Sequence, residues 1–242
     1  MISIIAAFQF LTIFPAIIKR MFAPQEMGRA VGWFPLVGVV LGLALCGMNY
    51  AAQLVFPSSV AAVLTIFAWV VFTRAFHLDG FMDTCDGIYG GFTPERRLEI
   101  MKDSRVGAFG VAGGILILLL KYSALASMSA SNLFSAMVLA TTLGKWASSL
   151  VIFAFPYARE DGLGIEMKRN VRWKEVVIAT IIALSVSLIF QGWFGLILMF
   201  VAALTAFLLA LYFMRLLHGL TGDNYGAVTE MVEAITLVLF TL

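Results

Sequence analysis

The chain consists of long apolar stretches separated by short polar connections. A membrane-spanning helix needs roughly 20 apolar residues, within a range of about 17–25. Most of the stretches reach that length, whereas the first and the last are marginal. The pattern therefore predicts about seven spanning helices, with limits of six and eight. The eight stretches cover residues 1–18, 31–56, 60–76, 106–128, 132–155, 175–192, 194–217 and 227–242.

The polar connections between these stretches alternate in character. Three are short and uncharged, at 57–59, 129–131 and 191–192. The others hold most of the Lys and Arg residues, and they cover 19–30, 77–105, 156–174 and 218–226. Connections rich in Lys and Arg lie on the cytoplasmic side of a membrane. We therefore expect the charged connections, and with them an active site, to face the cytoplasm.

Composition agrees with this pattern. Hydrophobic residues make up 62% of the 242 residues and charged residues only 12%, whereas a soluble domain is about a quarter charged. In lipid, only helices and closed barrels satisfy all of their backbone groups, and the continuous apolar runs differ from the alternating strands of a barrel. The sequence predicts an all-α, polytopic integral membrane helix bundle, formed as a single membrane-embedded domain over residues 1–242.

Charge and cysteine content exclude two other classes. The net charge of +2 is too small to indicate a protein that binds nucleic acid. The two cysteines, Cys46 and Cys85, are too few for a disulfide scaffold or a thiolate metal site.

The connection at 77–105 carries the most distinctive chemistry. Asp79, Asp83 and Asp86 are spaced i, i+4 and i+7, which places three carboxylates on one face of a helix. Such close carboxylates repel one another unless a cation lies between them, and oxygen ligands without Cys favour a hard ion, Mg²⁺ with Mn²⁺ as the alternative. Gly80 and Gly87, each directly after an aspartate, suggest a ligand that approaches the backbone. The simpler alternative is a solvated acidic face, although such a face usually includes lysines.

Polar residues also flank the acidic motif. His77 lies two residues before Asp79 and points elsewhere on an ideal helix, so a hydrogen-bonded or interfacial histidine is at least as expected as a catalytic one. Arg105 has a guanidinium that suits phosphate oxygens beside a bound metal. For Lys102, anchoring at the membrane surface is favoured over contact with a substrate.

A second acidic group occurs near the end of the chain. Asp223, Glu230 and Glu233 lie on one helical stripe. Carboxylates within a span are costly, so a functional site is the first hypothesis, with an ion pair to Lys145 or a proton path as the alternatives. Lys145 itself either contacts an anionic substrate or pairs with a glutamate. Lys121 is expected to extend its amine towards the membrane surface.

Together these motifs resemble the cobalamin synthase (adenosylcobinamide-GDP ribazoletransferase) family. The central match is His77-Leu78-Asp79-Gly80 with Asp83-Thr84 and Asp86-Gly87, followed by Leu98-Glu99-Ile100-Met101-Lys102-Asp103-Ser104-Arg105. Shorter matches extend in order over essentially the whole chain, at Phe10-Leu11-Thr12, Phe34-Pro35-Leu36-Val37-Gly38, Tyr157-Ala158-Arg159-Glu160, Gly162-Leu163-Gly164 and Thr221-Gly222-Asp223. The mild departures, which leave every acidic position in place, are Phe81-Met82, Cys85 and His218.

The resemblance implies a Mg²⁺-dependent enzyme of the cell inner membrane that completes cobalamin assembly. It would join adenosylcobinamide-GDP to α-ribazole, or to α-ribazole 5′-phosphate, and release GMP. Its partners would be these substrates and the lipid bilayer, without nucleic acid. Homo-oligomers and association with other enzymes of the corrinoid pathway stay open.

The resemblance also suggests roles for individual residues. The expected metal ligands are Asp79, Asp83, Asp86 and Asp103. The hydroxyl proton of ribazole would pass to Asp83 or Asp86, and Arg105 would contact phosphate. The further expected substrate contacts are His77, Lys102, Lys145, Asp223, Glu230 and Glu233.

Two alternatives compete with this hypothesis. A CDP-alcohol phosphatidyltransferase also places spaced aspartates at a cytoplasmic helix end, but its signature has an Ala-Arg pair soon after the first Asp-Gly, where this chain has Phe81-Met82. A cation or corrinoid transporter predicts broken helices and repeats in both halves of the chain. The sequence shows no such repeat, and its carboxylates gather on one side.

Overall fold

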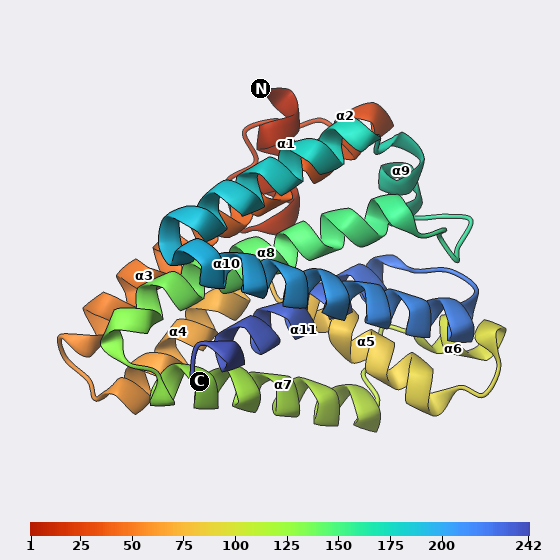
Figure 1. Cartoon of the computed structure of the whole chain (residues 1–242). Coiled ribbons are helices and arrows are strands. Elements are labelled where there is room, and N and C mark those ends of the chain that lie inside the picture. The colour runs from red at the N-terminus through yellow and green to blue at the C-terminus, as the bar shows by residue number, and fades with distance from the viewer.

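The chain folds into a bundle of helices (Figure 1). The computed structural model describes all residues from 1 to 242, and it contains no strand, only an isolated bridge between Tyr157 and Leu220. The all-α prediction is confirmed. In chain order the elements are α1 (Ile2–Leu11), α2 (Pro24–Ala30), the 3₁₀ helix η1 (Val31–Trp33), α3 (Phe34–Gln53), α4 (Ser58–Phe72), α5 (Phe76–Gly90), α6 (Pro94–Ile100), α7 (Ala108–Ser127), α8 (Ala130–Ala154), α9 (Leu163–Asn170), α10 (Trp173–Leu217) and α11 (Gly222–Leu239).

Fewer helices are suited to cross a membrane than the sequence predicts. Four are long and apolar enough: α3 together with the short helices before it, α7, α8 and α10. α4 and α5 pass only when counted together as a fifth, broken span, although they meet at 88°. The number is lower than predicted because α1 has only 10 residues and α11 carries three carboxylates. The stretches 1–18 and 227–242 thus fall short of spanning helices.

α10 consists of two arms that fold back on each other. At Gly192 the backbone has φ 52° and ψ −127°, a conformation that glycine adopts without steric cost. A Cβ built on Gly195 would overlap the backbone of Ser187, so the residues on either side of the turn are in contact. The predicted stretches 175–192 and 194–217 are therefore both present. Counted separately, the two arms add one to the number of candidate spans.

The uncharged and the charged connections lie at opposite ends of the bundle, as the sequence predicts (Figure 1). At the uncharged end, the turn of α10 meets α8 through Phe134 and Phe190, whose ring centroids are 5.7 Å apart. At the charged end, the amine of Lys102 lies 3.1 Å from the Asp161 carboxylate, which joins two of the long connections. The polar chemistry of the chain is therefore concentrated at one end.

α8 is the central helix and is buried along most of its length. It packs against α3, α10 and α11. A Cβ on Gly42 of α3 would lie 2.6 Å from the Val138 Cα, so the two backbones approach closely. Small residues commonly allow such contacts between helices in membranes. This packing fixes the scaffold on which the polar end is built.

Candidate active site

α5 carries the acidic motif and begins at an abrupt turn. Arg74 and Ala75 both have a φ of 54°, in the left-handed region that non-glycine residues rarely adopt. The Arg74 guanidinium stabilises the turn by donating hydrogen bonds to the carbonyl oxygens of Gln9 (3.1 Å) and Phe10 (2.9 Å). The turn ends the apolar run of α4 and directs α5 along α7 and α11.

α5 packs closely against two neighbouring helices at its glycines. A Cβ on Gly80 would lie 2.9 Å from the Cα of Asp223 at the start of α11. A Cβ on Gly87 would lie 2.9 Å from the Arg97 carbonyl oxygen of α6. Close helix packing therefore accounts for both glycines, and it replaces the expected ligand approach at Gly87. Gly80 also lines the cavity described below.

The start of α11 is held in place by its own side chains. The Thr221 hydroxyl accepts the Asn224 N–H at 3.3 Å, and the Asn224 side chain accepts the Thr221 N–H at 2.9 Å. This reciprocal arrangement satisfies two of the free N–H groups at a helix start. The Asn224 amide also donates to the Thr84 hydroxyl of α5 at 3.1 Å. The two helices that carry the conspicuous carboxylates are therefore fixed relative to each other.

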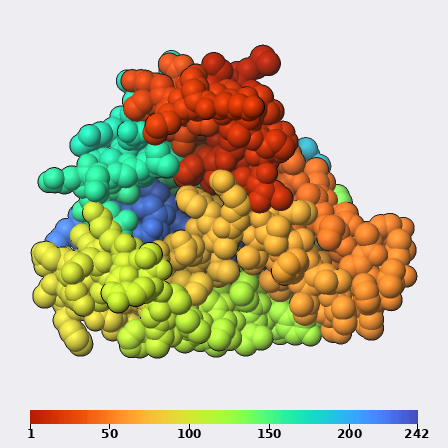
Figure 2. Space-filling model, turned by 180° about the vertical axis from the view of Figure 1, so that it is seen from behind, coloured from red at the N-terminus to blue at the C-terminus, as the bar shows by residue number.

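A cavity of about 390 Å³ opens where these two helices meet α1, α3 and α9. Figure 2 shows the face on which it lies, with the blue C-terminal segment visible at the bottom of a hollow between the red, gold and teal segments. The charged residues that line this cavity are Asp79, Lys102, Arg159, Asp161 and Asp223.

Asp223 and Arg159 form the central ion pair of this cavity. The Arg159 Nη2 lies 2.8 Å from the Asp223 Oδ2, and both side chains are largely buried. Burial raises the pKa of Asp223, and the Arg159 guanidinium opposes that rise. The Arg159 Nε has no partner within the protein. Arg159 lines the cavity, and a guanidinium with an unpaired N–H is suited to bind phosphate oxygens.

Arg159 was not among the predicted site residues. Its connection, 156–174, looks like an ordinary charged loop in the sequence. In the structure the Ala158 N–H donates to the Leu220 carbonyl at 2.8 Å, and the Leu220 N–H donates to the Pro156 carbonyl at 2.9 Å. These two bonds carry the loop to the start of α11. The only signal in the sequence was the segment Tyr157-Ala158-Arg159-Glu160, which belongs to the family resemblance.

Asp83 lies one turn beyond Asp79 on α5 and is half-buried. Its pKa is raised to about 7, first by burial and then by the charges of Asp79, Asp223 and Asp86. The positive charge of Arg159 offsets only part of this effect. Asp83 therefore lies in a region of excess negative charge, where a cation would be stabilised.

Asp86 has a different environment from the other two aspartates of the motif. It is buried, and its two oxygens accept the N–H groups of Gly107 (2.7 Å) and Gly110 (2.8 Å). These are the free donors at the start of α7, where a carboxylate is stabilised by the helix dipole. Because each oxygen already accepts a backbone N–H, this geometry favours a capping role for Asp86 over the predicted role as proton acceptor.

Asp103 and Arg105 pair with each other. The Arg105 Nη2 lies 2.6 Å from the Asp103 Oδ2, and this hydrogen bond lowers the pKa of Asp103 to about 2. With Asp86 they line a second cavity of about 380 Å³, away from Asp79. The structure therefore does not gather the four predicted metal ligands, Asp79, Asp83, Asp86 and Asp103, into one cluster.

No group of three or more His, Cys, Asp or Glu side chains is placed to hold a metal ion. Mg²⁺, however, is commonly bound by one or two carboxylates together with substrate phosphates. Asp79 and Asp83 offer two oxygen ligands on one face of α5, and Asp83 lies among uncompensated negative charges. The chemistry of these two residues fits Mg²⁺, whereas Asp86 and Asp103 are occupied by other partners.

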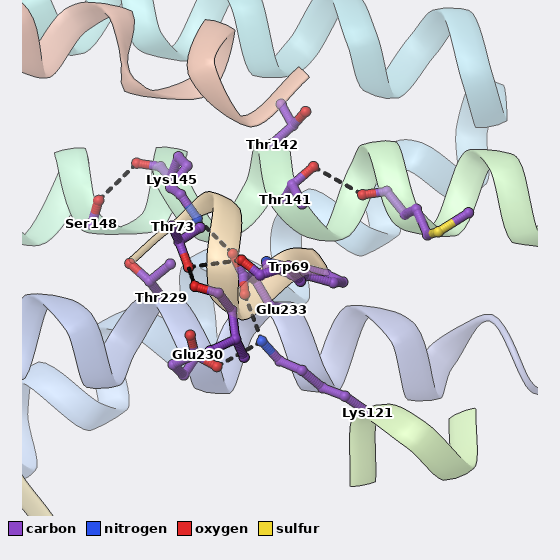
Figure 3. A network of polar contacts seen from close by, with 12 residues as sticks. Trp69, Thr73, Lys121, Thr141, Thr142, Lys145, Ser148, Thr229, Glu230 and Glu233 are labelled. Carbon is purple, nitrogen blue, oxygen red and sulfur yellow. Dashed lines mark hydrogen bonds and ion pairs between the residues drawn. The ribbon is translucent and has the colours of Figure 1, made fainter. Parts of the chain in front are cut away.

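The predicted residues within the bundle form a buried ion network (Figure 3). The Lys121 amine lies 2.6 Å from carboxylate oxygens of both Glu230 and Glu233, and the Lys145 amine lies 2.7 Å from Glu233. Lys121 also lies over the Trp69 ring, 4.5 Å from its centroid. Pairing of Lys145 with a glutamate is therefore confirmed. The expectation that Lys121 reaches the membrane surface is wrong.

This network lies apart from the cavity. None of its four charged residues lines the cavity that holds Asp79 and Arg159. Substrate contacts of Lys145, Glu230 and Glu233 therefore gain no support from the structure. The other three predicted contacts, His77, Lys102 and Asp223, do line the cavity.

Comparison with known proteins links this geometry to a described family. The family described as cobalamin-5-phosphate synthase matches residues 3–241. An adenosylcobinamide-GDP ribazoletransferase from Roseiflexus sp. (strain RS-1) is 37% identical over 236 residues, which are 98% of this chain and 88% of that protein. One from Desulforamulus reducens is 37% identical over 241 residues, 99% of this chain and 96% of its own. One from Syntrophobacter fumaroxidans is 38% identical over 234 residues, 96% of this chain and 94% of its own. No solved structure matches the chain.

Proposed function

This chain belongs to the cobalamin-5-phosphate synthase family, and from this premise we propose that it joins adenosylcobinamide-GDP to α-ribazole, or to α-ribazole 5′-phosphate, with release of GMP. The observation that carries the proposal is similarity over nearly the whole chain to relatives with that named activity. The resemblance stated from the sequence motifs is thereby confirmed. Neither a CDP-alcohol phosphatidyltransferase nor a transporter accounts for a match of this extent.

The cavity at the charged end supports this reaction. A free ribose hydroxyl of ribazole attacks the phosphorus next to cobinamide and gives up its proton to a base of the site. The bond from that phosphorus to the GMP oxygen breaks, and the product keeps the phosphate as a diester. Enzymes accelerate such transfers mainly by positioning the groups and stabilising phosphate charge. Arg159 binds phosphate oxygens through its free Nε, and Lys102 adds a second positive charge at the cavity.

Asp79 and Asp83 are the residues that would hold Mg²⁺. When bound, the ion neutralises phosphate charge and stabilises the leaving group. The surroundings of Asp83 support this assignment, because burial and then the negative charges of Asp79, Asp223 and Asp86 raise its pKa to about 7, and a cation would offset those charges. Asp86 and Asp103 are not part of the proposed ligand set.

Asp223 is the proposed acceptor of the ribazole hydroxyl proton. It lines the cavity, its Oδ2 accepts hydrogen bonds from Arg159 and Thr221, and its Oδ1 has no partner within the protein. Burial raises its pKa, which makes the carboxylate a better proton acceptor. This assignment replaces the expectation from the sequence that Asp83 or Asp86 accepts the hydroxyl proton.

We place the protein in the cell inner membrane with the charged end in the cytoplasm. Its apolar helices make it a membrane protein, and the Lys- and Arg-rich connections support the orientation. The cytoplasmic face is also where a nucleotide-activated substrate and free GMP are available.

The test is a GMP-release assay on purified protein in lipid. We expect GMP only when adenosylcobinamide-GDP, α-ribazole and Mg²⁺ are all present, and no CMP from CDP-diacylglycerol. Release of CMP, or corrinoid uptake into vesicles without chemistry, would contradict the proposal. GMP release that persists after complete removal of divalent cations would show that the reaction does not need Mg²⁺.

A further inference from the structure

Besides the Arg159 Nε, two buried polar groups at the cavity have no partner within the protein. They are the His77 Nδ1 and the Tyr225 hydroxyl, and their residues are only 4% and 6% exposed. Buried polar atoms are nearly always hydrogen-bonded, and an unpaired one is costly. Both residues line the cavity that holds Asp79 and Arg159. Their unpaired atoms therefore indicate a ligand with polar groups of its own.

The same cavity has an aromatic wall. Phe10 lies against Phe34 and Phe76, with ring centroids 6.3 Å and 4.9 Å away. Phe76 continues to the His77 ring at 5.3 Å. Ile152, which is almost fully buried, also lines the cavity. This wall carries no charge, in contrast to the side that holds Asp79, Arg159 and Asp223.

A second aromatic pair lies next to the charged residues. The ring centroids of Tyr157 and Tyr225 are 6.1 Å apart, and both rings line the cavity. Tyr225 follows Asp223 by two residues in the first turn of α11. The cavity is therefore lined by charged groups, by two tyrosines and by apolar rings.

We propose that this cavity binds the nucleoside substrate, with its aromatic base against Phe10, Phe34 and Phe76 and its polar atoms at Tyr225 and His77. The inference rests on the proposed function and assigns one of the two substrates to the cavity. The base of α-ribazole is a dimethylbenzimidazole, which is flat, largely apolar and carries one free ring nitrogen. Guanine has several donors and acceptors, and the aromatic wall offers too few partners for them. A corrinoid ring is far larger than a cavity of about 390 Å³.

This orientation is consistent with the chemistry of the site. A base that lies against the aromatic wall leaves the sugar near Tyr225, with its reacting hydroxyl towards Asp223 and Arg159. The adenosylcobinamide-GDP molecule then approaches from the open side with only its diphosphate at Asp79 and Arg159. Tyr225 and His77 are thus positioning residues for one substrate rather than parts of the phosphate site.

Tyr225→Phe is the most direct test, because it removes a hydroxyl that no protein group uses. Loss of one hydrogen bond is expected to raise the KM for α-ribazole about five- to tenfold. The KM for adenosylcobinamide-GDP and the thermal midpoint of unfolding are expected to stay unchanged. Tyr212→Phe, at a 44% exposed tyrosine of α10, is the matched control and should change neither KM.

A second variant and a binding measurement complete the test. His77→Phe keeps an aromatic ring and is also expected to raise the KM for α-ribazole alone. Equilibrium binding of α-ribazole and of guanosine to the protein in lipid nanodiscs measures occupancy of the cavity without turnover. Guanosine is expected not to compete with α-ribazole for the cavity. A higher KM for adenosylcobinamide-GDP in Tyr225→Phe, or competition by guanosine, overturns the assignment. Absence of GMP release from the wild-type protein would instead overturn the proposed function.

Discussion

The Arg159 guanidinium donates a hydrogen bond to the Asp223 carboxylate at 2.8 Å, across 64 residues of sequence. This pair joins the loop after α8 to the first turn of α11. It holds Asp223 in a largely buried position and leaves the Arg159 Nε without a protein partner. One contact therefore fixes both the proposed proton acceptor and the proposed phosphate ligand.

Replacing Arg159 is expected to affect catalysis more than any other single cation of the cavity. Arg159→Lys keeps the charge but loses the planar set of donors that suits a phosphate. We expect kcat/KM for adenosylcobinamide-GDP to fall by roughly 10- to 100-fold in Arg159→Lys, and further in Arg159→Ala, which leaves Asp223 unpaired. Steady-state GMP release gives these values.

Arg96→Ala is the matched control for Arg159. Arg96 pairs with Glu99 on the exposed surface of α6, and both side chains are more than half exposed. Such pairs contribute little, about 0–1 kcal/mol. Activity close to wild type is expected, so an equal loss in the two variants would show that Arg159 acts only through general charge.

Mg²⁺ binding is expected to weaken as the pH falls below about 7. The pKa of Asp83 is raised to about 7, so the carboxyl is protonated at lower pH. A metal must displace that proton, and the apparent dissociation constant for Mg²⁺ should rise up to tenfold per pH unit below the pKa and level off above it. The Mg²⁺ dependence of GMP release, measured roughly from pH 6 to pH 8, gives this profile.

Two variants separate the proposed ligand from a bystander. Asp83→Asn should weaken Mg²⁺ binding and remove its pH dependence in this range. Asp103→Asn should leave both unchanged, because Arg105 holds the pKa of Asp103 near 2 and the residue lies at another cavity. An Asp103→Asn protein with a strongly increased Mg²⁺ requirement would return Asp103 to the ligand set.

Asp86 is expected to stabilise the fold rather than to bind a metal. Asp86→Asn places an NH₂ group where a carboxylate oxygen accepts the N–H of Gly107 or Gly110. Losing such a cap costs about 1–2 kcal/mol. The thermal midpoint in detergent should fall, with an unchanged Mg²⁺ dependence of the remaining activity. A changed Mg²⁺ dependence at an unchanged midpoint would contradict this assignment.

Sequence patterns predicted the local features of this protein better than the distant contacts. The spacing of Asp79 and Asp83 placed two carboxylates on one helix face because a helix has a fixed period. The same spacing did not show that Asp86 caps α7, since that depends on the approach of Gly107 from the next connection. Likewise, nothing local indicates that Arg159 meets Asp223.

The membrane spans were also predicted where they depend on local sequence and missed where they depend on distant contacts. Hydropathy located the apolar stretches, including the two arms that meet at Gly192. It did not reveal the turn at Arg74 and Ala75, because a left-handed conformation at non-glycine residues depends on tertiary contacts such as those of the Arg74 guanidinium. Hydropathy left the stretches at the ends of the chain marginal, and helix length and carboxylate content now count against spans there.

The buried ion network provides a last prediction, which concerns stability. Glu233 accepts hydrogen bonds from both Lys121 and Lys145, and all three side chains are almost fully buried. Removing one lysine leaves two buried carboxylates to share one positive charge, so one negative charge is uncompensated, at a cost of up to about 3–5 kcal/mol. Lys145→Met should therefore lower the thermal midpoint markedly, although Lys145 does not touch the cavity.

A double variant tests whether pairing is the cause. In Lys145→Met with Glu233→Gln, one positive and one negative charge are removed together, while Lys121 keeps Glu230 as its partner. The combined loss of stability should be smaller than the sum of the two single losses, because the pair is removed as a unit. Additive losses would mean that each residue acts through separate packing contacts. Unchanged KM values in whichever variants fold would place this network in the scaffold of the bundle and outside the substrate site.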